Sequence, residues 1–416
     1  MTSKVIVCEP YFSGSHRAWA EGLAAHSAHD VRLVTHAGGF WKWRMQGAAL
    51  TLADEVRRLV SDWGPPDLLV ASDMVHLPAL LGFARDVLVG VPVVVYFHEN
   101  QMTYPVPEGV AADETYAMTN WLSMAAADRV VFNSAYHRAD VLAALPRLLR
   151  RLPDHRHMSA LDAVMERTSV LPVGVDAARF AGPRSFGGDE QRPDADDPAG
   201  IAGGLPGEGR RPPGVLWNHR WEYDKDPAAF FGALRAVADA GVDFELIVAG
   251  ESYQTEPAEF ERARSELADR IVWFGTASDE QYPSLLRRAD VVVSTARHEF
   301  FGVAVVEAIT AGALPLLPRR LSYPELVPEP ADIYLYAADP ALVDPADPAD
   351  QPAGVDLPAG GGAGLVERLC WALTDHDGRR AAAAVARKHV EQFAWPHVAP
   401  RYDALFSEVI GPAEIS

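Results

Sequence analysis

Two glutamates, Glu299 and Glu307, flank a glycine-containing turn in the segment STARHEFFGVAVVEA at 294–308. The β-branched run at 291–293 predicts a buried parallel strand, and the apolar positions after the turn predict a helix that ends before Gly312. Ligands bind beyond the carboxyl ends of such strands, and a helix N-terminus attracts anions, so the turn around Gly302 predicts an anion site. Carboxylates bind hydroxyl groups and repel phosphate, so the pattern favours a diphosphate joined to sugars, unless both glutamates are surface charges.

A second segment, NHRWEYDKDP at 218–227, follows a predicted strand at 215–217. Asp226 and the proline after it have the residue types that start a helix, which places Arg220 and Lys225 in the loop before that helix. The loop follows the carboxyl end of a predicted strand, although ordinary surface charges would give the same pattern.

In the N-terminal half, polar residues also follow predicted strands. His98 and Glu99 come directly after the strand at 93–97, and Asn133 follows the strand at 130–132. A lone histidine often has a structural role, but the carboxyl end of a parallel strand is where ligands bind in this architecture. The first predicted strand, at 5–8, leads into a glycine turn before a helix that we expect to begin near Arg17.

Two segments carry positive charge in an otherwise acidic chain, whose net charge is −20. FWKWR at 40–44 alternates tryptophans with cations, which suits a nucleobase and its phosphates, or else the tryptophans pack inside the protein. The segment at 137–157 is rich in arginine, which is typical of a phosphate-binding patch or of a solvated helix face. The overall charge argues against a generic nucleic-acid binder.

The length of 416 residues exceeds what one hydrophobic core supports, so we expect two domains. The segments 181–214 and about 338–364 are rich in Gly, Pro and small or acidic residues, and predict a flexible linker and a disordered loop. The predicted domains are therefore residues 1–180 and 215–390, with a terminal helix at 391–416. Segment 171–176 resembles the strand and loop that close the N-terminal domain in family-4 glycosyltransferases.

Several classes of protein are disfavoured. The sequence contains neither G-x-G-x-x-G nor a Walker A motif. Its two cysteines, Cys8 and Cys370, predict small buried side chains rather than a disulfide framework or a zinc site. No apolar stretch has the ~20 residues of a membrane span, and the N-terminus does not resemble a signal peptide, so we expect a cytoplasmic protein without a membrane partner.

The E-x7-E spacing resembles the donor site of retaining GT-B glycosyltransferases of family 4. The longer strings, together with HENQ at 98–101 after Phe97 and LPDHRH at 152–157, resemble the tRNA-queuosine mannosyltransferase family over nearly the whole chain. The resemblance implies an α/β GT-B fold of two Rossmann-like domains facing a cleft, with the C-terminal helix crossing back to the N-terminal domain. It also implies metal-independent transfer of mannose from GDP-mannose, with retention of configuration, to queuosine in the anticodon of tRNA-Asp. No cofactor is expected.

The resemblance assigns roles to individual residues. Arg220 and Lys225 would neutralise the diphosphate, Glu299 would position the sugar, and His98 would complete the catalytic set. The expected donor-binding residues are Gly14, Gly250, Gly275, Thr276, Phe300, Phe301, Gly302, Val303 and the ribose-binding Glu307. The expected acceptor-binding residues are Ser15, His16, Trp41, Trp43, Arg44, Glu99, Asn100, Gln101, Asn133, Arg150, Arg151, Asp154, His155 and Arg156.

Two other functions fit the same residues. A glycan, a lipid or a small metabolite could replace tRNA as the acceptor, and the acidic net charge is the best support for this alternative. A protein that binds a sugar nucleotide without catalysis is the second alternative, against which the intact charged set argues. The oligomeric state stays open.

Overall fold

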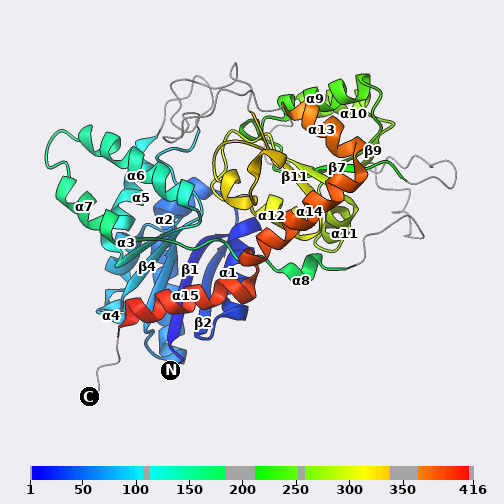
Figure 1. The fold of residues 1–416 in the computed structure, drawn as a ribbon. Coiled ribbons are helices and arrows are strands. Elements are labelled where there is room, and N and C mark those ends of the chain that lie inside the picture. Colours follow the sequence, from blue (N-terminus) through cyan, green and yellow to red (C-terminus); the bar gives the residue numbers. More distant parts are fainter. Residues whose placement is uncertain (1, 106–112, 183–210, 252–257, 338–363, 412–416) are drawn as a thin grey trace. The chain divides into compact units, whose positions relative to one another are not determined.

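The computed structural model describes residues 2–105, 113–182, 211–251, 258–337 and 364–411 (Figure 1). The chain divides into two units: unit 1 comprises Met1–Val175 and Phe393–Ser416, and unit 2 comprises Asp176–Gln392. Most of the expected linker and almost all of the expected loop at 338–364 lie outside the described residues. Each unit contains a six-stranded sheet whose described strand pairs are parallel, as expected for a Rossmann-like domain.

The sheet of unit 1 has the order β2-β1-β3-β4-β5-β6. Its strands are β1 (Lys4–Phe12), β2 (Asp30–Ala37), β3 (Leu68–Ser72), β4 (Val93–Phe97), β5 (Arg129–Phe132) and β6 (Thr168–Val170). The central strand β1 pairs with both β2 and β3, so that Val7 lies between Leu33 and Val70. Strands β3 and β4 are buried along their whole length, which explains their continuous apolar sequences.

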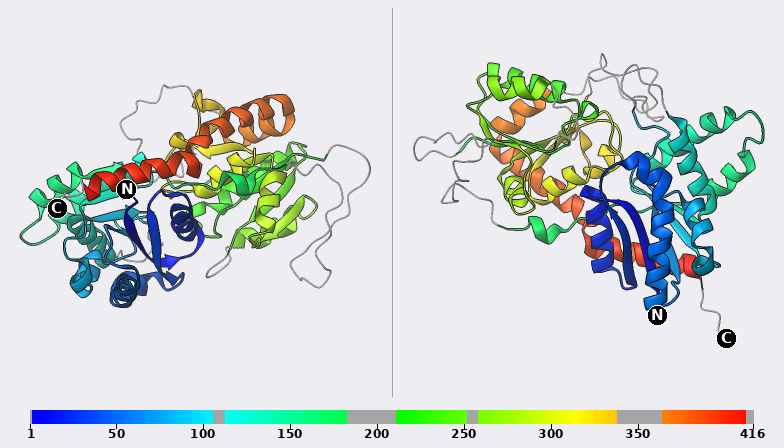
Figure 2. Two further views of the ribbon diagram at one scale, coloured as in Figure 1. Left: turned by 90° about the horizontal axis from the view of Figure 1, so that it is seen from below. Right: turned by 180° about the vertical axis from the view of Figure 1, so that it is seen from behind.

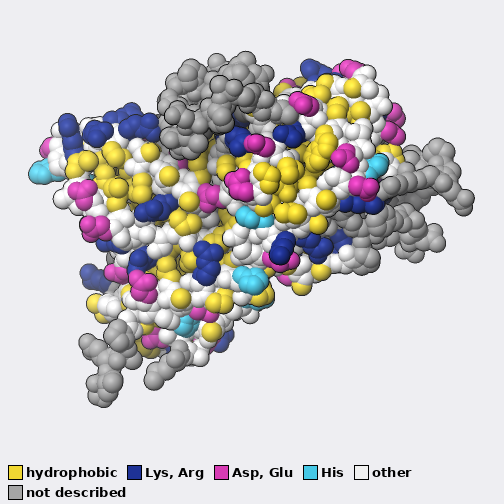
Figure 3. All heavy atoms as spheres, viewed as in Figure 1, with side chains coloured by type: hydrophobic (Ala, Val, Ile, Leu, Met, Phe, Trp, Pro, Cys, Tyr) yellow, Lys and Arg dark blue, Asp and Glu magenta, His cyan; other side chains and the backbone are white. Residues whose placement is uncertain are grey.

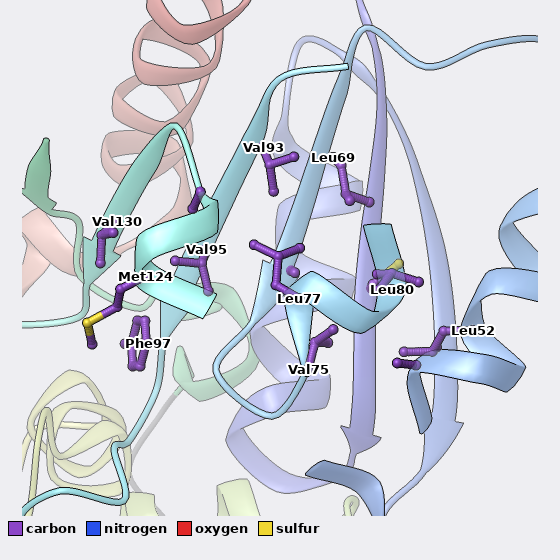
Figure 4. Packing of buried hydrophobic residues seen from close by; sticks show 14 of the residues in the cluster. Leu52, Leu69, Val75, Leu77, Leu80, Val93, Val95, Phe97, Met124 and Val130 are labelled. Carbon is purple, nitrogen blue, oxygen red and sulfur yellow. The ribbon is translucent and has the colours of Figure 1, made fainter. Parts of the chain in front are cut away.

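Helices cover the sheet of unit 1. They are α1 (Gly14–His26), α2 (Trp41–Trp63), α3 (Leu77–Phe83), α4 (Arg85–Leu88), α5 (Glu114–Ala126), α6 (Ala135–Arg150), α7 (Met158–Glu166) and α15 (Trp395–Ile410). Helices α2, α3 and α5 pack against one another, and α1 packs against α15 (Figure 2). Leu52 of α2, Leu77 of α3 and Met124 of α5 meet the side chains of β3, β4 and β5 in one core cluster (Figure 4).

Helix α15 belongs to unit 1 although it follows the whole of unit 2 in sequence. The Trp19 indole donates a hydrogen bond to the Tyr402 hydroxyl at 3.0 Å, and that hydroxyl donates to the Pro172 carbonyl at 3.2 Å. Trp395 covers Gly22 and Gly174, where a Cβ atom would come within about 2.5 Å of its ring. The expected return of the C-terminal helix to the N-terminal domain is therefore confirmed.

The sheet of unit 2 has the order β12-β11-β10-β7-β8-β9. Its strands are β7 (Gly214–Trp217), β8 (Glu245–Ala249), β9 (Ile271–Gly275), β10 (Val291–Val293), β11 (Leu314–Pro318) and β12 (Leu335–Tyr336). The described helices are α8 (Ala177–Phe180), α9 (Pro227–Asp239), α10 (Ala258–Glu266), α11 (Gln281–Arg288), α12 (Val303–Thr310), α13 (Leu365–Thr374) and α14 (His376–Val390). Short 3₁₀ turns, η1 (Tyr223–Lys225), η2 (Tyr323–Leu326), η3 (Ala331–Ile333) and η5 (Glu391–Phe393), join them.

Two local predictions are wrong. Helix α1 begins at Gly14, three residues before Arg17, because extended Ser13 precedes it and the Arg17 amide already bonds the Ser13 carbonyl. The strand that closes the first sheet is β6 at Thr168–Val170, not the segment 171–176. Pro172 lacks the N–H that a sheet ladder needs, and from the segment only Val175 forms a β-bridge among the described residues.

Cys8 is fully buried and Cys370 is partly buried, and both thiols are free. Burial raises the pKa of the Cys8 thiol, so it is chemically inert as expected. In the part of the chain that the structure describes, no helix is both long enough and apolar enough to cross a bilayer.

Candidate active site

In unit 2, the predicted donor residues follow the two strands where the sheet order reverses. From β7 the chain builds outward through β8 and β9, then returns to place β10 on the other side of β7. Strands β7 and β10 are parallel neighbours, with Val215 opposite Val291. Such a reversal leaves a ligand-binding crevice at the carboxyl ends of the two strands.

Lys225 lies in the 3₁₀ turn η1 that follows β7. Its Nζ donates to the His298 carbonyl at 2.7 Å and to Glu299 Oε2 at 3.4 Å, and it lies 3.2 Å from Asp224 Oδ2. The loop after β7 therefore brings its cation to the carboxylate of the loop after β10. The structure thus places Lys225 and Glu299 together, as the sequence predicted.

The charges of this cluster support one another. Burial alone would lower the pKa of Lys225, but the carboxylates of Asp224 and Glu299 outweigh it and raise that pKa above its ordinary value. Burial would raise the pKa values of Asp224 and Glu299, but Lys225 lowers both. Burial, helped by the Lys225 charge, lowers the pKa of His298 to about 4. The cluster is thus one cation, two carboxylates and a neutral imidazole at neutral pH.

The two loops are also bonded through their backbones. Thr295 Oγ1 donates to the carbonyls of Lys225 and Asp226 at 2.8 and 3.0 Å. Arg297 Nε donates to Asp226 Oδ2 at 3.0 Å, and the Arg297 amide donates to the Asp224 carbonyl at 2.7 Å. These bonds hold Lys225 and Glu299 in a fixed relation before any ligand binds, which is the preorganisation that electrostatic catalysis requires.

Gly302 is the N-cap of α12 and has φ +94°, a conformation that side chains rarely adopt. An added Cβ would also lie 3.1 Å from Leu326 Cδ1. Glycine is therefore favoured at this position, which precedes the first amides of α12, beginning at Val303, and a helix N-terminus is where anions bind.

Glu307 lies one turn into α12, partly buried. Its Oε2 accepts a hydrogen bond from the Tyr282 hydroxyl of α11 at 2.9 Å, and that hydroxyl accepts one from Asn218 Nδ2 at 3.0 Å. Burial raises the pKa of Glu307 to about 7, against the hydrogen bond from Tyr282. Glu307 is thus poised between its charged and neutral forms, and sequence reasoning missed the two side chains that orient it.

The remaining donor residues lie at neighbouring strand ends. Gly250 has no room for a side chain, since a Cβ would lie 2.0 Å from the His219 carbonyl oxygen. The Gly250 amide donates to the Gly275 carbonyl at 3.2 Å, and Thr276 Oγ1 donates to the Gly250 carbonyl at 3.4 Å. Phe300 and Phe301 are buried and form the wall before Gly302 rather than an exposed surface.

Arg220 lies in the loop between β7 and Lys225, and its side chain is 44% exposed. Its Nη1 lies 3.4 Å from Glu222 Oε2. The charge of Arg220 also lowers the pKa of Asp224, behind the larger effects of burial and Lys225, so it belongs to the same electrostatic cluster.

In unit 1, the sheet order reverses between β1 and β3, and functional candidates again follow the central strands. His16 and His98 have ring centroids 4.1 Å apart. Glu9, at the buried end of β1, accepts from His16 Nδ1 at 2.9 Å, and Asp73 Oδ1 accepts from the His98 amide at 2.8 Å. Sequence reasoning missed Glu9 and Asp73, although Glu9 is a carboxylate inside an apolar strand.

The residues that were expected to form a glycine-containing loop belong to helix α1 instead. Gly14, Ser15 and His16 form the first turn of the helix. Only His16 of the three is buried, and it alone faces His98.

The side-chain amides of Asn100 and Gln101 form hydrogen bonds within the loop that begins with the HENQ segment. Asn100 Oδ1 accepts from the amides of Met102 and Thr103, and Gln101 Nε2 donates to Glu99 Oε1 at 3.1 Å. Asn133 Nδ2 donates to the His98 carbonyl at 2.8 Å. These side chains therefore hold the backbone on which His98 sits.

The FWKWR segment separates into two kinds of aromatic residue. Trp41 packs against Tyr116 with centroids 5.1 Å apart, whereas Trp43 is 63% exposed and Phe40 is 85% exposed. Arg44 Nη2 donates to the Ala37 carbonyl at 3.1 Å and so holds the start of α2. Only Phe40 and Trp43 present free ring faces, and the sequence analysis did not single out Phe40.

The arginine-rich segment lies at the end of α6 and in the loop before α7. Figure 3 shows Lys and Arg side chains gathered over this part of unit 1. Arg151 pairs with Glu114 at the start of α5, and Arg156 Nε donates to the Leu152 carbonyl at 3.3 Å. The exposed side chains in this segment include Arg150, Arg151, Asp154, His155 and Arg156.

Among the described residues, one group of three could hold a metal ion: Glu9, His16 and His98, whose ligand atoms lie within 4.8 Å of one another. Both oxygens of Glu9 are already hydrogen-bonded, one to His16 and the other to the Tyr11 amide at 2.7 Å. Glu9 is therefore satisfied by its hydrogen bonds to His16 and Tyr11.

Comparisons with known proteins agree with this arrangement. Residues 4–175 match the family model described as tRNA-queuosine alpha-mannosyltransferase N-terminal, and residues 208–339 match glycosyl transferases group 1. The chain is 33% identical to a tRNA-queuosine alpha-mannosyltransferase of Drosophila melanogaster over 330 residues, which cover 78% of this chain and 82% of that protein. It is also 28% identical to a GDP-mannose:cellobiosyl-diphosphopolyprenol alpha-mannosyltransferase of Xanthomonas oryzae, over 49% of this chain and 50% of that protein.

Solved structures show the same fold at low sequence identity. A sucrose-phosphate synthase from Thermosynechococcus elongatus has a TM-score of 0.65 at 18% identity, with 98% of this chain and 99% of that chain covered. The Anabaena protein HepE, in complex with UDP and glucose, has a TM-score of 0.61 at 15% identity, with 98% and 100% covered. The fold is GT-B, and the chain belongs to the tRNA-queuosine alpha-mannosyltransferase family of glycosyltransferases.

Proposed function

We propose that this enzyme transfers mannose from GDP-mannose to the queuosine nucleoside of tRNA-Asp, with retention of configuration. The observation that carries the proposal is the preorganised cluster of Lys225 with Glu299, next to the Gly302 turn. A sugar joined to a diphosphate presents hydroxyls and phosphates side by side, and this site offers carboxylate acceptors beside a cation and the N-terminus of α12. The family membership supplies the acceptor and the sugar.

The chemistry breaks the bond between the sugar C1 and the diphosphate oxygen, and forms a bond from C1 to an acceptor hydroxyl oxygen. The acceptor's proton passes to the leaving diphosphate, so no protein base is consumed. Negative charge grows on the leaving group, where Lys225, Arg220 and the first amides of α12 would stabilise it. Glu299 would hold sugar hydroxyls, and Glu307 would bind the ribose.

For the acceptor, unit 1 offers an exposed surface suited to RNA. Phe40 and Trp43 can stack on bases, and Lys42 lies beside them in the sequence. Arg150 supplies an exposed charge from α6. Replacing Arg150 with serine should raise KM for tRNA and flatten the salt dependence of binding, without changing donor hydrolysis.

The decisive experiment incubates the protein with radiolabelled GDP-mannose and total tRNA from queuosine-containing and queuosine-deficient cells. We expect label on tRNA only from the queuosine-containing cells, and digestion to nucleosides should place it on the queuosine fraction. Equal labelling of both tRNA pools would refute the acceptor. Label on a free small diol but not on tRNA would favour a small-metabolite acceptor, and no consumption of the donor would favour a binding protein.

A further inference from the structure

Glu9 is a fully buried carboxylate that the transfer chemistry above does not use. It lies in the central strand of the unit 1 sheet, between β2 and β3. Burying a charged carboxylate is costly unless it is paired and hydrogen-bonded. Both of its oxygens meet this condition, because Oε1 accepts from the Tyr11 amide at 2.7 Å and Oε2 from His16 Nδ1 at 2.9 Å.

His16, which Glu9 binds, in turn packs against His98. The His16 ring lies against the His98 ring, with centroids 4.1 Å apart and planes inclined by 36°. Trp19 and Tyr96 enclose His98 edge to face, each with a centroid 4.8 Å away. The orientation of His98 is therefore fixed by packing, and its Nε2 is buried without a hydrogen-bond partner among the described residues.

The surrounding charges give the two histidines different protonation states. Burial would lower the pKa of His16, but the charge and hydrogen bond of Glu9 outweigh it and raise the pKa to about 9. Burial first, and then the charges of His16 and His137, lower the pKa of His98 well below its usual range. Burial raises the pKa of Asp73 and so disfavours its charged form. Glu9, which accepts the hydrogen bond from His16, is therefore the direct partner of the His16 imidazolium. The titratable groups that face the pair are Glu9, Tyr11, Asp73, Tyr96, Glu99 and His137.

We propose that Glu9 is a positioning residue for the transfer reaction: its hydrogen bond fixes the His16 ring, and the His16 ring packs against His98 and fixes the orientation of His98 Nε2, which would accept a hydrogen bond from an acceptor hydroxyl. This assignment rests on the proposed function. A neutral imidazole can accept a hydrogen bond from a hydroxyl, whereas an imidazolium cannot. The ligand class is a neutral polyhydroxy group, as in the diol of a nucleoside.

The test combines NMR titration of the histidine rings with transfer kinetics. In the parent, His16 should stay protonated to about pH 9, and His98 should titrate well below its ordinary range. Glu9→Gln keeps the size of the side chain and an acceptor for the Tyr11 amide but removes the charge. We expect the variant to lower the pKa of His16, because the charge of Glu9 is removed, and to lower kcat about tenfold or more with little change in KM for the donor.

The matched control is Glu21→Gln. Glu21 lies on α1, the helix that carries His16. It is exposed and pairs with Arg17 at 2.9 Å, so the loss of its charge should leave the pH profile unchanged. Thermal unfolding of both variants separates misfolding from a lost charge. Should Glu9→Gln fail to fold, His16→Asn provides the second route: it should lower kcat similarly and let the pKa of His98 rise.

The outcomes separate this assignment from the proposed function. A parent that labels no tRNA would refute the proposed function, whereas a parent that labels tRNA and whose Glu9→Gln variant folds and keeps the parental kcat would overturn only the role of Glu9. A His16 that titrates near pH 6.5 in the parent would overturn the assignment whatever the activity. Stoichiometric Zn²⁺ binding that Glu9→Gln abolishes would overturn it too, because the cluster would then be a metal site.

Discussion

Replacing Lys225 with methionine tests the donor cluster most directly. Methionine fills the same volume but removes the charge, and leaves the carboxylates of Asp224 and Glu299 without their cation. Breaking a buried ion pair in this way costs roughly 3–5 kcal/mol. Because the Glu299 side chain is 23% exposed, we expect the lower end, ~3 kcal/mol, or about 6–12 °C in the melting temperature of unit 2.

The pH dependence of stability tests the buried ion pairs more specifically than a melting temperature at a single pH. In the parent, Lys225 lowers the carboxylate pKa values, so their contribution to stability is present above about pH 4.5 and is lost only as pH falls below it. In Lys225→Met the largest opposing charge is lost, and burial, the largest effect on both carboxylates, should outweigh the remaining effects of Arg220 on Asp224 and of the Phe301 backbone hydrogen bond on Glu299 and raise both pKa values. The folded variant then binds more protons than the unfolded chain, so its stability should fall as pH rises from 5 to 8.

Thermal unfolding at several pH values, with steady-state transfer kinetics at neutral pH, measures both effects. We expect kcat to fall about 10²-fold, by analogy with the loss of one preorganised donor to a developing negative charge. Lys388→Met is the control, because Lys388 is an exposed lysine of the same unit. A Lys225→Met protein that unfolds at the parental temperature, with a flat profile between pH 5 and 8, would show that the cluster is not a buried ion network.

Three further predictions concern the nucleotide and the acceptor. Calorimetric affinity for GDP should weaken below about pH 7 as Glu307 protonates, and Glu307→Gln should remove this dependence. Tyr282→Phe should move the midpoint to higher pH, because the Tyr282 hydrogen bond lowers the pKa of Glu307, and an unshifted midpoint would show that this hydrogen bond does not affect that pKa. Gly302→Ala should cost ~1–2 kcal/mol from its positive φ and weaken GDP binding, and unchanged affinity would argue against close approach of the diphosphate. Trp43→Ala should raise KM for tRNA about tenfold, while Leu50→Ala on the exposed side of the same helix should not; equal effects would point to the helix rather than to stacking.

Much of the fold could be predicted because parallel strands are buried on both faces. The apolar runs at 93–97 and 291–293 matched β4 and β10 at every residue. Thr168–Val170 could not be recognised in this way, because a half-buried edge strand has no continuous apolar run. The more apolar segment after it is extended and buried, but it packs against α15, which comes more than two hundred residues later.

The candidate site was predictable where function follows a strand end, and not where it depends on contacts between distant segments. His98 and Glu299 could be identified from position alone. Tyr282 is 25 residues from Glu307 and on another helix, so no local pattern connects the two. Glu9 looked like an interruption of an apolar strand, and only its contact with His16 explains why a carboxylate can be buried there.

Both units place a buried cation after the strand beside which the sheet order reverses, but the two cations are different residues. That strand is β1 in unit 1 and β7 in unit 2. In unit 2 the cation is Lys225, whose raised pKa gives a permanent charge suited to a diphosphate. In unit 1 it is His16, whose charge depends on Glu9 and can be lost near pH 9, next to a histidine kept neutral. A permanent charge suits the leaving group, whereas a neutral imidazole beside a conditional charge suits a hydroxyl, and this difference is why we assign the donor to unit 2 and the acceptor to unit 1.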